Sequence, residues 1–82
     1  MNRITILGLY ISEEIKDKTG LQYILTKYGN IIRTRVGLNQ ECGSKGIILL
    51  ELFGDEQEMS NFENALARFE GLEFQRMHFS GK

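Results

Sequence analysis

Two short segments of this chain are apolar at nearly every position, and this feature constrains the fold most. Ile4–Ile11 reads ITILGLYI and Ile47–Phe53 reads IILLELF, with Glu51 as the one charged residue in the second segment. Continuous β-branched and aliphatic runs of this length are typical of strands that are covered on both faces. We therefore predict that both segments are central strands of a sheet.

Two further segments have the pattern of strands at the edges of that sheet. Ile31–Leu38 (IIRTRVGL) and Leu72–Phe79 (LEFQRMHF) mix charged and apolar residues in partial alternation. Because successive side chains on a strand point to opposite faces, such segments keep one face wet. In the first segment the pattern predicts one face with Arg33 and Arg35, and the other with Ile32, Thr34 and Val36.

A helix is predicted over residues 13–28, between the first two strands. Ser12 is a preferred type of N-cap residue, and the acidic pair Glu13 and Glu14 suits the positive end of a helix dipole. Gly29 is expected to end the helix. The apolar stripe of this helix would contain Leu21, Ile24, Leu25 and Tyr28.

A second helix is predicted after the strand Ile47–Phe53. Asp55 and Glu58 have the spacing of a capping box, in which each side chain accepts a hydrogen bond from the backbone N–H of the other residue. The helix is expected to stop before Gly71. Its apolar stripe, at three- and four-residue spacing, would be Met59, Phe62, Leu66 and Phe69.

The element order is βαββαβ, with a polar turn at Asn39–Gly46, and it predicts one α+β domain over residues 1–82. The strands that are apolar on both faces are the first and the third. A ferredoxin-like antiparallel sheet with strand order 4-1-3-2 requires this distribution, and both helices then cover one face. The other face would keep apolar side chains that the chain cannot cover. We therefore expect a homodimer or homotetramer that forms through the sheet face or the edge strands.

Charge and composition narrow the classes of partner. The chain has 10 basic and 11 acidic residues, so no overall positive field favours direct nucleic acid binding or an anionic membrane. The longest apolar runs fall well short of the ~20 residues of a membrane helix. The single cysteine, Cys42, cannot form an internal disulfide, which suits a reducing compartment, and we expect a cytoplasmic protein.

No sequence motif predicts catalysis or a metal site. His78 and Cys42 are the only histidine and cysteine, so the paired spacings of zinc sites are absent from the sequence. No motif gives a serine or the cysteine a histidine partner, and the scattered glycines form neither a P-loop nor a dinucleotide fingerprint. We therefore expect a protein without enzymatic activity, metal or cofactor.

Three arginines are the first candidates for binding a ligand or a partner. Arg33 and Arg35 would form a cationic patch with Arg76 if their strands presented them on one face, and such a patch suits a small anion or an acidic partner. The alternative is a solvated edge, or salt bridges between subunits that involve Glu51 and Glu73.

The segment Asp17–Leu25 (DKTGLQYIL) is the second candidate. It resembles the effector loop of ACT domains, where backbone groups near a glycine hold a small molecule at a subunit interface. The resemblance would give Asp17 and Gly20 a role in binding. The alternative is a plain amphipathic helix that tolerates one glycine.

The stretch Tyr28–Leu38 (YGNIIRTRVGL) resembles the iron-only hydrogenase system regulators, and the likeness continues through Gly46–Ile48 and Leu66–Met77. Those proteins are similar to the ACT domain and to the C-terminal domain of nickel-responsive repressors. The resemblance implies a ferredoxin-like oligomer with a regulatory role, in transcription if a partner binds the DNA. The chain has Asn39 where the family has proline and lacks the nickel ligands as a set, so nickel sensing and direct operator binding are not implied.

We therefore expect a regulatory domain that senses a small ligand or a partner protein in connection with the iron-only hydrogenase system. The alternative is a structural protein–protein interaction module with no small ligand. An acylphosphatase-like hydrolase would need an arginine in the loop after the first strand, and Tyr10–Lys16 contains none. The residues expected to bind are Arg33, Arg35 and Gly37, followed by Asp17 and Gly20.

Overall fold

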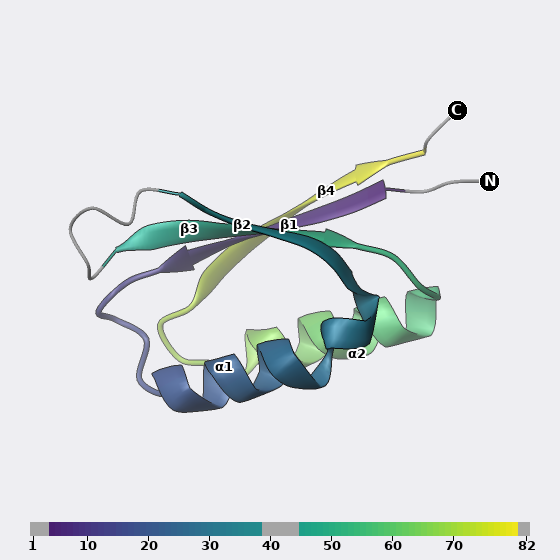
Figure 1. Ribbon diagram of the computed structural model, residues 1–82. Helices are drawn as coiled ribbons and strands as arrows, with labels where there is room; N and C mark the ends of the chain where they lie inside the picture. Colours follow the sequence, from purple (N-terminus) through teal and green to yellow (C-terminus); the bar gives the residue numbers. More distant parts are fainter. Residues whose placement is uncertain (1–3, 39–44, 81–82) are drawn as a thin grey trace.

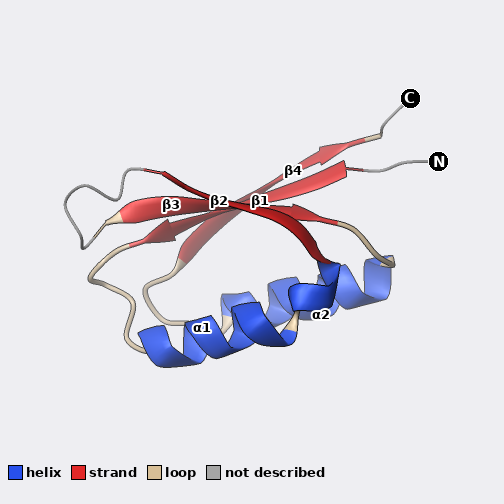
Figure 2. Ribbon diagram, viewed as in Figure 1, coloured by secondary structure: helices blue, strands red, loops and turns tan. Residues whose placement is uncertain are grey.

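The computed structural model describes residues 4–38 and 45–80 and consists of one sheet and one layer of helices (Figure 1). Its elements are β1 (Ile4–Ile11), α1 (Lys18–Lys27), the 3-10 helix η1 (Gly29–Ile31), β2 (Ile32–Leu38), β3 (Gly46–Leu52), α2 (Glu56–Ala67) and β4 (Glu73–Phe79). The strands are antiparallel in the order β2-β3-β1-β4, and both helices lie under one face of the sheet (Figure 2). This arrangement confirms the predicted α+β, ferredoxin-like βαββαβ fold. Residues 39–44 of the predicted turn, with Cys42 among them, lie outside the described residues.

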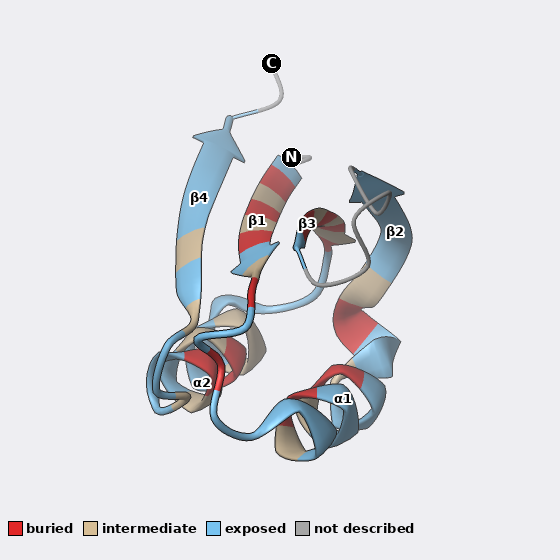
Figure 3. Cartoon of the chain, turned by 90° about the vertical axis from the view of Figure 1, so that its left-hand side faces the viewer, coloured by how far each residue is buried: buried red, intermediate tan, exposed pale blue. Residues whose placement is uncertain are grey.

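The core lies between the sheet and the helices (Figure 3). Alternate residues of β1 and β3 are buried there, and Leu7 and Leu50 are 0% exposed. Phe62 of α2 is equally buried, with its ring centroid 5.0 Å from that of Tyr28. The stripes predicted for both helices face this core. The buried apolar residues are Leu7, Leu9, Ile15, Leu21, Leu25, Ile31, Ile48, Leu50, Leu52, Phe62 and Leu66.

The first helix begins later than the sequence predicts, because Asp17 and not Ser12 is its N-cap. The Asp17 carboxylate accepts a hydrogen bond from the Gly20 backbone N–H at 2.9 Å. Ser12 Oγ accepts a hydrogen bond from the Glu14 N–H, which closes only a local turn. The intervening segment is held elsewhere, since Ile15 is buried and the Lys16 N–H donates to the Glu70 carbonyl.

The other predicted helix ends are confirmed in part. Tyr28 is the C-cap of α1, and Gly29 opens η1 rather than ending the helix with a positive φ angle. Asp55 is the N-cap of α2, as predicted, and accepts from the Glu58 N–H at 2.7 Å. The reciprocal half of the capping box is wrong, because the Glu58 carboxylate accepts a hydrogen bond from Asn30 Nδ2.

A β-bulge in β2 changes the predicted faces of that strand. Ile32 is opposite Leu52, whereas Thr34 is opposite Glu51, so the register shifts by one residue between them. Residues that are opposite each other in a ladder share a face, so Ile32 lies on the helix side and Thr34 on the other side. The prediction that these two residues share a face is therefore wrong. The alternating pattern of the sequence cannot show the extra residue, Arg33, that a bulge inserts.

Candidate functional site

The sheet face that points away from the helices, which we call the open face, is covered by no described part of the chain (Figure 3). Large apolar side chains from all four strands lie on it, and Tyr10, Met77 and Phe79 are 39%, 50% and 53% exposed. A contiguous apolar surface marks an interaction site, whereas single exposed apolar residues are ordinary. The apolar residues of the open face are Ile4, Ile6, Tyr10, Val36, Leu38, Ile47, Leu49, Met77 and Phe79.

The predicted binding residues of β2 lie along a free edge of the sheet. The Arg33 guanidinium is 4.8 Å from the centre of the Phe53 ring, within range of a cation–π contact. Arg35 is opposite the core residue Leu50, so its side chain starts on the helix side of the sheet, as does the position of Gly37. The edge therefore presents two exposed cations.

Arg76 does not join these two arginines in one patch. It belongs to β4, at the opposite edge of the sheet, and two central strands separate it from β2. Three strand spacings of about 4.8 Å place the edges roughly 14 Å apart. Its guanidinium contacts the Glu63 carboxylate of α2 at 3.4 Å. The hypothesis of a three-arginine patch is therefore wrong, and within the described chain Arg76 pairs with an acid of the helix layer.

Gly20 belongs to α1 and Asp17 is its N-cap, so both lie in the helix layer and not in the sheet (Figure 1). The N-cap hydrogen bond between them explains the spacing that resembles an effector loop. A Cβ atom at residue 20 would overlap the Asp17 carboxylate, so the glycine lets the capping side chain lie close to the helix backbone. The structure thus gives these two residues a local role and does not bring them together with Arg33 and Arg35.

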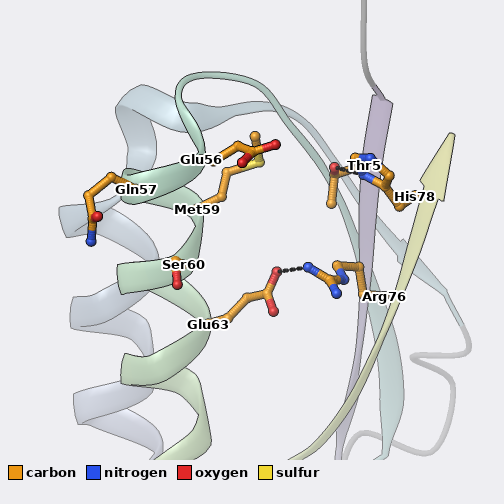
Figure 4. A pocket seen from close by; sticks show the side chains of 8 residues that line it. All are labelled: Thr5, Glu56, Gln57, Met59, Ser60, Glu63, Arg76 and His78. Atoms are coloured by element: carbon orange, nitrogen blue, oxygen red, sulfur yellow. Dashed lines mark hydrogen bonds and ion pairs between the residues drawn. The ribbon is translucent and has the colours of Figure 1, made fainter. Parts of the chain in front are cut away.

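A groove of about 540 Å³ lies between α2 and the β1–β4 side of the sheet, and polar side chains from both sides line it (Figure 4). Glu63 and Arg76 meet across it. At its far end Thr5 Oγ1 and His78 Nδ1 lie 3.0 Å apart, and the imidazole tautomer decides which atom donates. Thr5 is buried and Arg76 is exposed, so the groove is polar on its floor and open at its rim.

The pattern of the sequence does not predict this groove. Arg76 and His78 are two residues apart and share one face of β4, and Glu63 lies beside the buried stripe of α2. The spacing in the sequence therefore indicates which face of each element these side chains belong to. The sequence does not indicate, however, that α2 packs against this edge of the sheet. Since Glu63 and Arg76 are on opposite sides of the groove, a small polar ligand with both an acidic and a basic group is chemically suited to it.

The described residues contain no group of three or more histidine, cysteine, aspartate or glutamate side chains placed to hold a metal ion. None of the helices within residues 4–38 and 45–80 is long and apolar enough to cross a membrane.

Comparison with solved structures defines the class of the protein as a small ferredoxin-like domain. An uncharacterized protein, TM1266 from Thermotoga maritima, is similar over 96% of this chain and 100% of that chain, with a TM-score of 0.80 and 19% sequence identity. No family model matches this sequence, and no curated protein matches it.

Two further structures are less similar. A formyltetrahydrofolate deformylase from Pseudomonas putida KT2440 has a TM-score of 0.55 and 10% identity, over 90% of this chain and 28% of that chain. LarC2, the C-terminal domain of a cyclometallase involved in the synthesis of the NPN cofactor of lactate racemase, has a TM-score of 0.51 and 10% identity, over 96% of this chain and 57% of that chain. At such identities these likenesses establish the fold alone.

Proposed function

We propose that this chain is a cytoplasmic regulatory domain that works as an assembly of identical copies, with the open face as the contact between them. The observation that supports this proposal is the continuity of apolar side chains over all four strands of that face. Leaving apolar surface in water costs about 25 cal/mol per Å², and a second copy of the same face removes that surface from water.

Sedimentation of the purified chain over a range of concentrations tests the assembly. The wild-type mass is expected to rise from one protomer to two or four. Met77→Lys puts a charge on the open face and should raise the dissociation constant at least about tenfold, since burying an unpaired charge costs more than ~1.4 kcal/mol. Tyr23→Lys, at a 65% exposed position of α1, is the matched control and should leave the mass unchanged. A wild-type chain that stays a protomer at every concentration would contradict the proposal.

The ligand or partner of the assembly is proposed to bind at the exposed edge of β2. Support comes from the two exposed cations there, Arg33 and Arg35, which lie next to Gly37 and carry the family resemblance. Replacing both arginines with alanine is expected to abolish ligand or partner binding with a change in unfolding free energy below about 1 kcal/mol, because exposed side chains contribute little to stability. Unchanged binding by the double variant would remove these residues from the site.

A link to the iron-only hydrogenase system is the finer part of the proposal, and it depends on the resemblance of Tyr28–Leu38 to the regulators of that system. Hydrogenase transcript and enzyme levels, compared between cells with and without the chain, test it. We expect both levels to change when the chain is removed, and equal levels in the two strains would overturn the link.

A structural interaction module without a small ligand is the second candidate. It is favoured by the fact that two candidate polar groups are already engaged within the chain, Asp17 with the Gly20 N–H and Arg76 with Glu63. A thermal-shift screen with amino acids, nucleotides and metal ions separates the candidates. A ligand at 100 times its Kd stabilises the folded state by about 2.7 kcal/mol. That is roughly 10–20 °C for a domain of this size, and a structural module would show no shift.

A further inference from the structure

A glycine occupies the middle of the open face. Gly8 lies at the centre of the central strand β1, and its position faces away from the helices, between the buried neighbours Leu7 and Leu9. Glycine weakens the interior of a strand by roughly 0.5–1 kcal/mol relative to alanine, so its presence calls for a physical reason.

The chain itself does not need a glycine there. The ladder from Ile6 to Tyr10 continues without a register shift against both β3 and β4, so Gly8 is not at a bulge. Its φ angle is not positive. A Cβ atom built on Gly8 would lie 3.5 Å from Leu49 Cδ2, which is ordinary van der Waals contact. The remaining reason for a glycine in a strand is the close approach of something from outside.

The residue directly opposite Gly8 in the ladder is Leu49, at the middle of β3 and on the same face. At the centre of the sheet, a residue without a side chain therefore lies next to a leucine. A twofold axis that runs along the strands, midway between β1 and β3, exchanges these two positions. It would bring Leu49 of each copy over Gly8 of the other copy.

We propose that two copies of this chain pack face to face through this reciprocal contact, with Leu49 of one copy seated on Gly8 of the other. The inference depends on the proposed assembly through the open face and specifies how it is built. A twofold interface must be complementary to itself, and a glycine next to a leucine can satisfy this requirement, because each leucine can lie on the glycine of the other copy. Two sheets that pack face to face in this way keep their strands within about 30° of each other.

Area and charge agree with a second copy as the occupant. Four strands about 4.8 Å apart, with seven residues at a rise of about 3.3 Å, give a flat footprint of roughly 440 Å² per copy. Two copies then bury roughly 900 Å² before the relief of the side chains is counted, which is just below the ~1,000 Å² that a specific interface should exceed. The net charge of -1 per chain gives little repulsion between copies. The described strands place two acids on the open face: Glu51, which accepts a hydrogen bond from Thr34 Oγ1 at 2.9 Å, and Glu73, which is opposite Tyr10.

A complementation experiment tests the contact. Gly8→Leu adds a side chain at the glycine, and Leu49→Ala removes the side chain that would lie on it. Each variant alone should have a dissociation constant at least about tenfold above wild type, because each homodimer contains two clashes or two voids. An equimolar mixture should recover an affinity within about threefold of wild type. In the mixed dimer, the larger side chain at position 8 of one variant faces the smaller side chain at position 49 of the other. The second contact in that dimer is the native pair of Gly8 and Leu49. Circular dichroism checks that each variant is folded, and Gly29→Ala, at an open position outside the sheet, is the control.

The outcomes separate this inference from the proposed assembly. The proposed contact is wrong if Gly8→Leu associates like wild type, or if the mixture associates no better than its components. If Met77→Lys still dissociates in either case, the open face remains the interface. If Gly8→Leu does not fold, Gly8→Ala replaces it and must still weaken association. A wild-type chain that never associates overturns both proposals.

Discussion

At the scale of single residues, Gly71 has the most stringent role in the described chain. Its φ angle is +89°, in the region that side chains rarely adopt, and a Cβ atom there would overlap the carbonyl oxygen of Glu14. The neighbouring hydrogen bond from the Lys16 N–H to the Glu70 carbonyl joins the same two loops. The glycine therefore allows the loop before α1 to lie against the loop after α2.

Gly71→Ala is accordingly expected to destabilise the fold by about 2–4 kcal/mol, because it adds both a disfavoured backbone conformation and a steric overlap. For a domain of this size that loss lowers the melting temperature by roughly 10–25 °C. Gly29→Ala is the matched control, since nothing lies within 4 Å of the added atom. Thermal denaturation of both variants checks the prediction, and equal melting temperatures would contradict the account of this loop.

The sequence can identify residue types at this scale, but not their neighbours. Local spacing predicts Asp55 as an N-cap, and the structure confirms it, because a cap depends on residues within one turn. The contact between Arg76 and Glu63 spans two elements that only the tertiary fold brings together. The N-cap of α1 is Asp17 and not the predicted Ser12 for the same reason. Ile15, between the two residues, is buried by the tertiary fold, and local spacing does not show this burial.

At the scale of elements, two substitutions at the start of α1 can separate a structural role of Asp17 from a role in ligand binding. Asp17→Ala should cost about 1 kcal/mol of unfolding free energy, the usual value of an N-cap, whereas Asp17→Asn keeps the accepting oxygen and should cost little. Chemical denaturation measures both variants. If Asp17→Ala loses no stability, the carboxylate does not act as the cap. If Asp17→Asn is stable and yet loses binding of a ligand found in the thermal-shift screen, the charge has a role in recognition.

The strands show why some elements are more predictable than others. The continuous apolar patterns of β1 and β3 predict nearly correct bounds, because such patterns do not depend on register. The alternation in β2 predicts the wrong faces, because a bulge at Arg33 interrupts it. The bounds of both edge strands are predicted to within one residue, so it is the direction of side chains in β2, and not its position, that the sequence pattern misses.

At the scale of the whole molecule, the distribution of apolar residues between central and edge strands predicts the strand order, and the structure has that order. The open face follows from the same argument, since two helices cover one side of a four-stranded sheet. The groove between α2 and β4 cannot be predicted by this argument, because sequence periodicity does not show which helix lies under which strand.

The central claim is that a second copy covers the open face, and protection of Met77 from oxidation tests it most directly. Met77 is 50% exposed on that face, whereas Met59 is partly buried in the helix layer, so the two methionines report on different surfaces of one chain. Oxidation of methionine depends on solvent access. The initial rate at Met77, followed by peptide mass spectrometry, should fall several-fold as the protein concentration rises through the association range, while the rate at Met59 stays constant. A constant rate at Met77 across that range would contradict the claim.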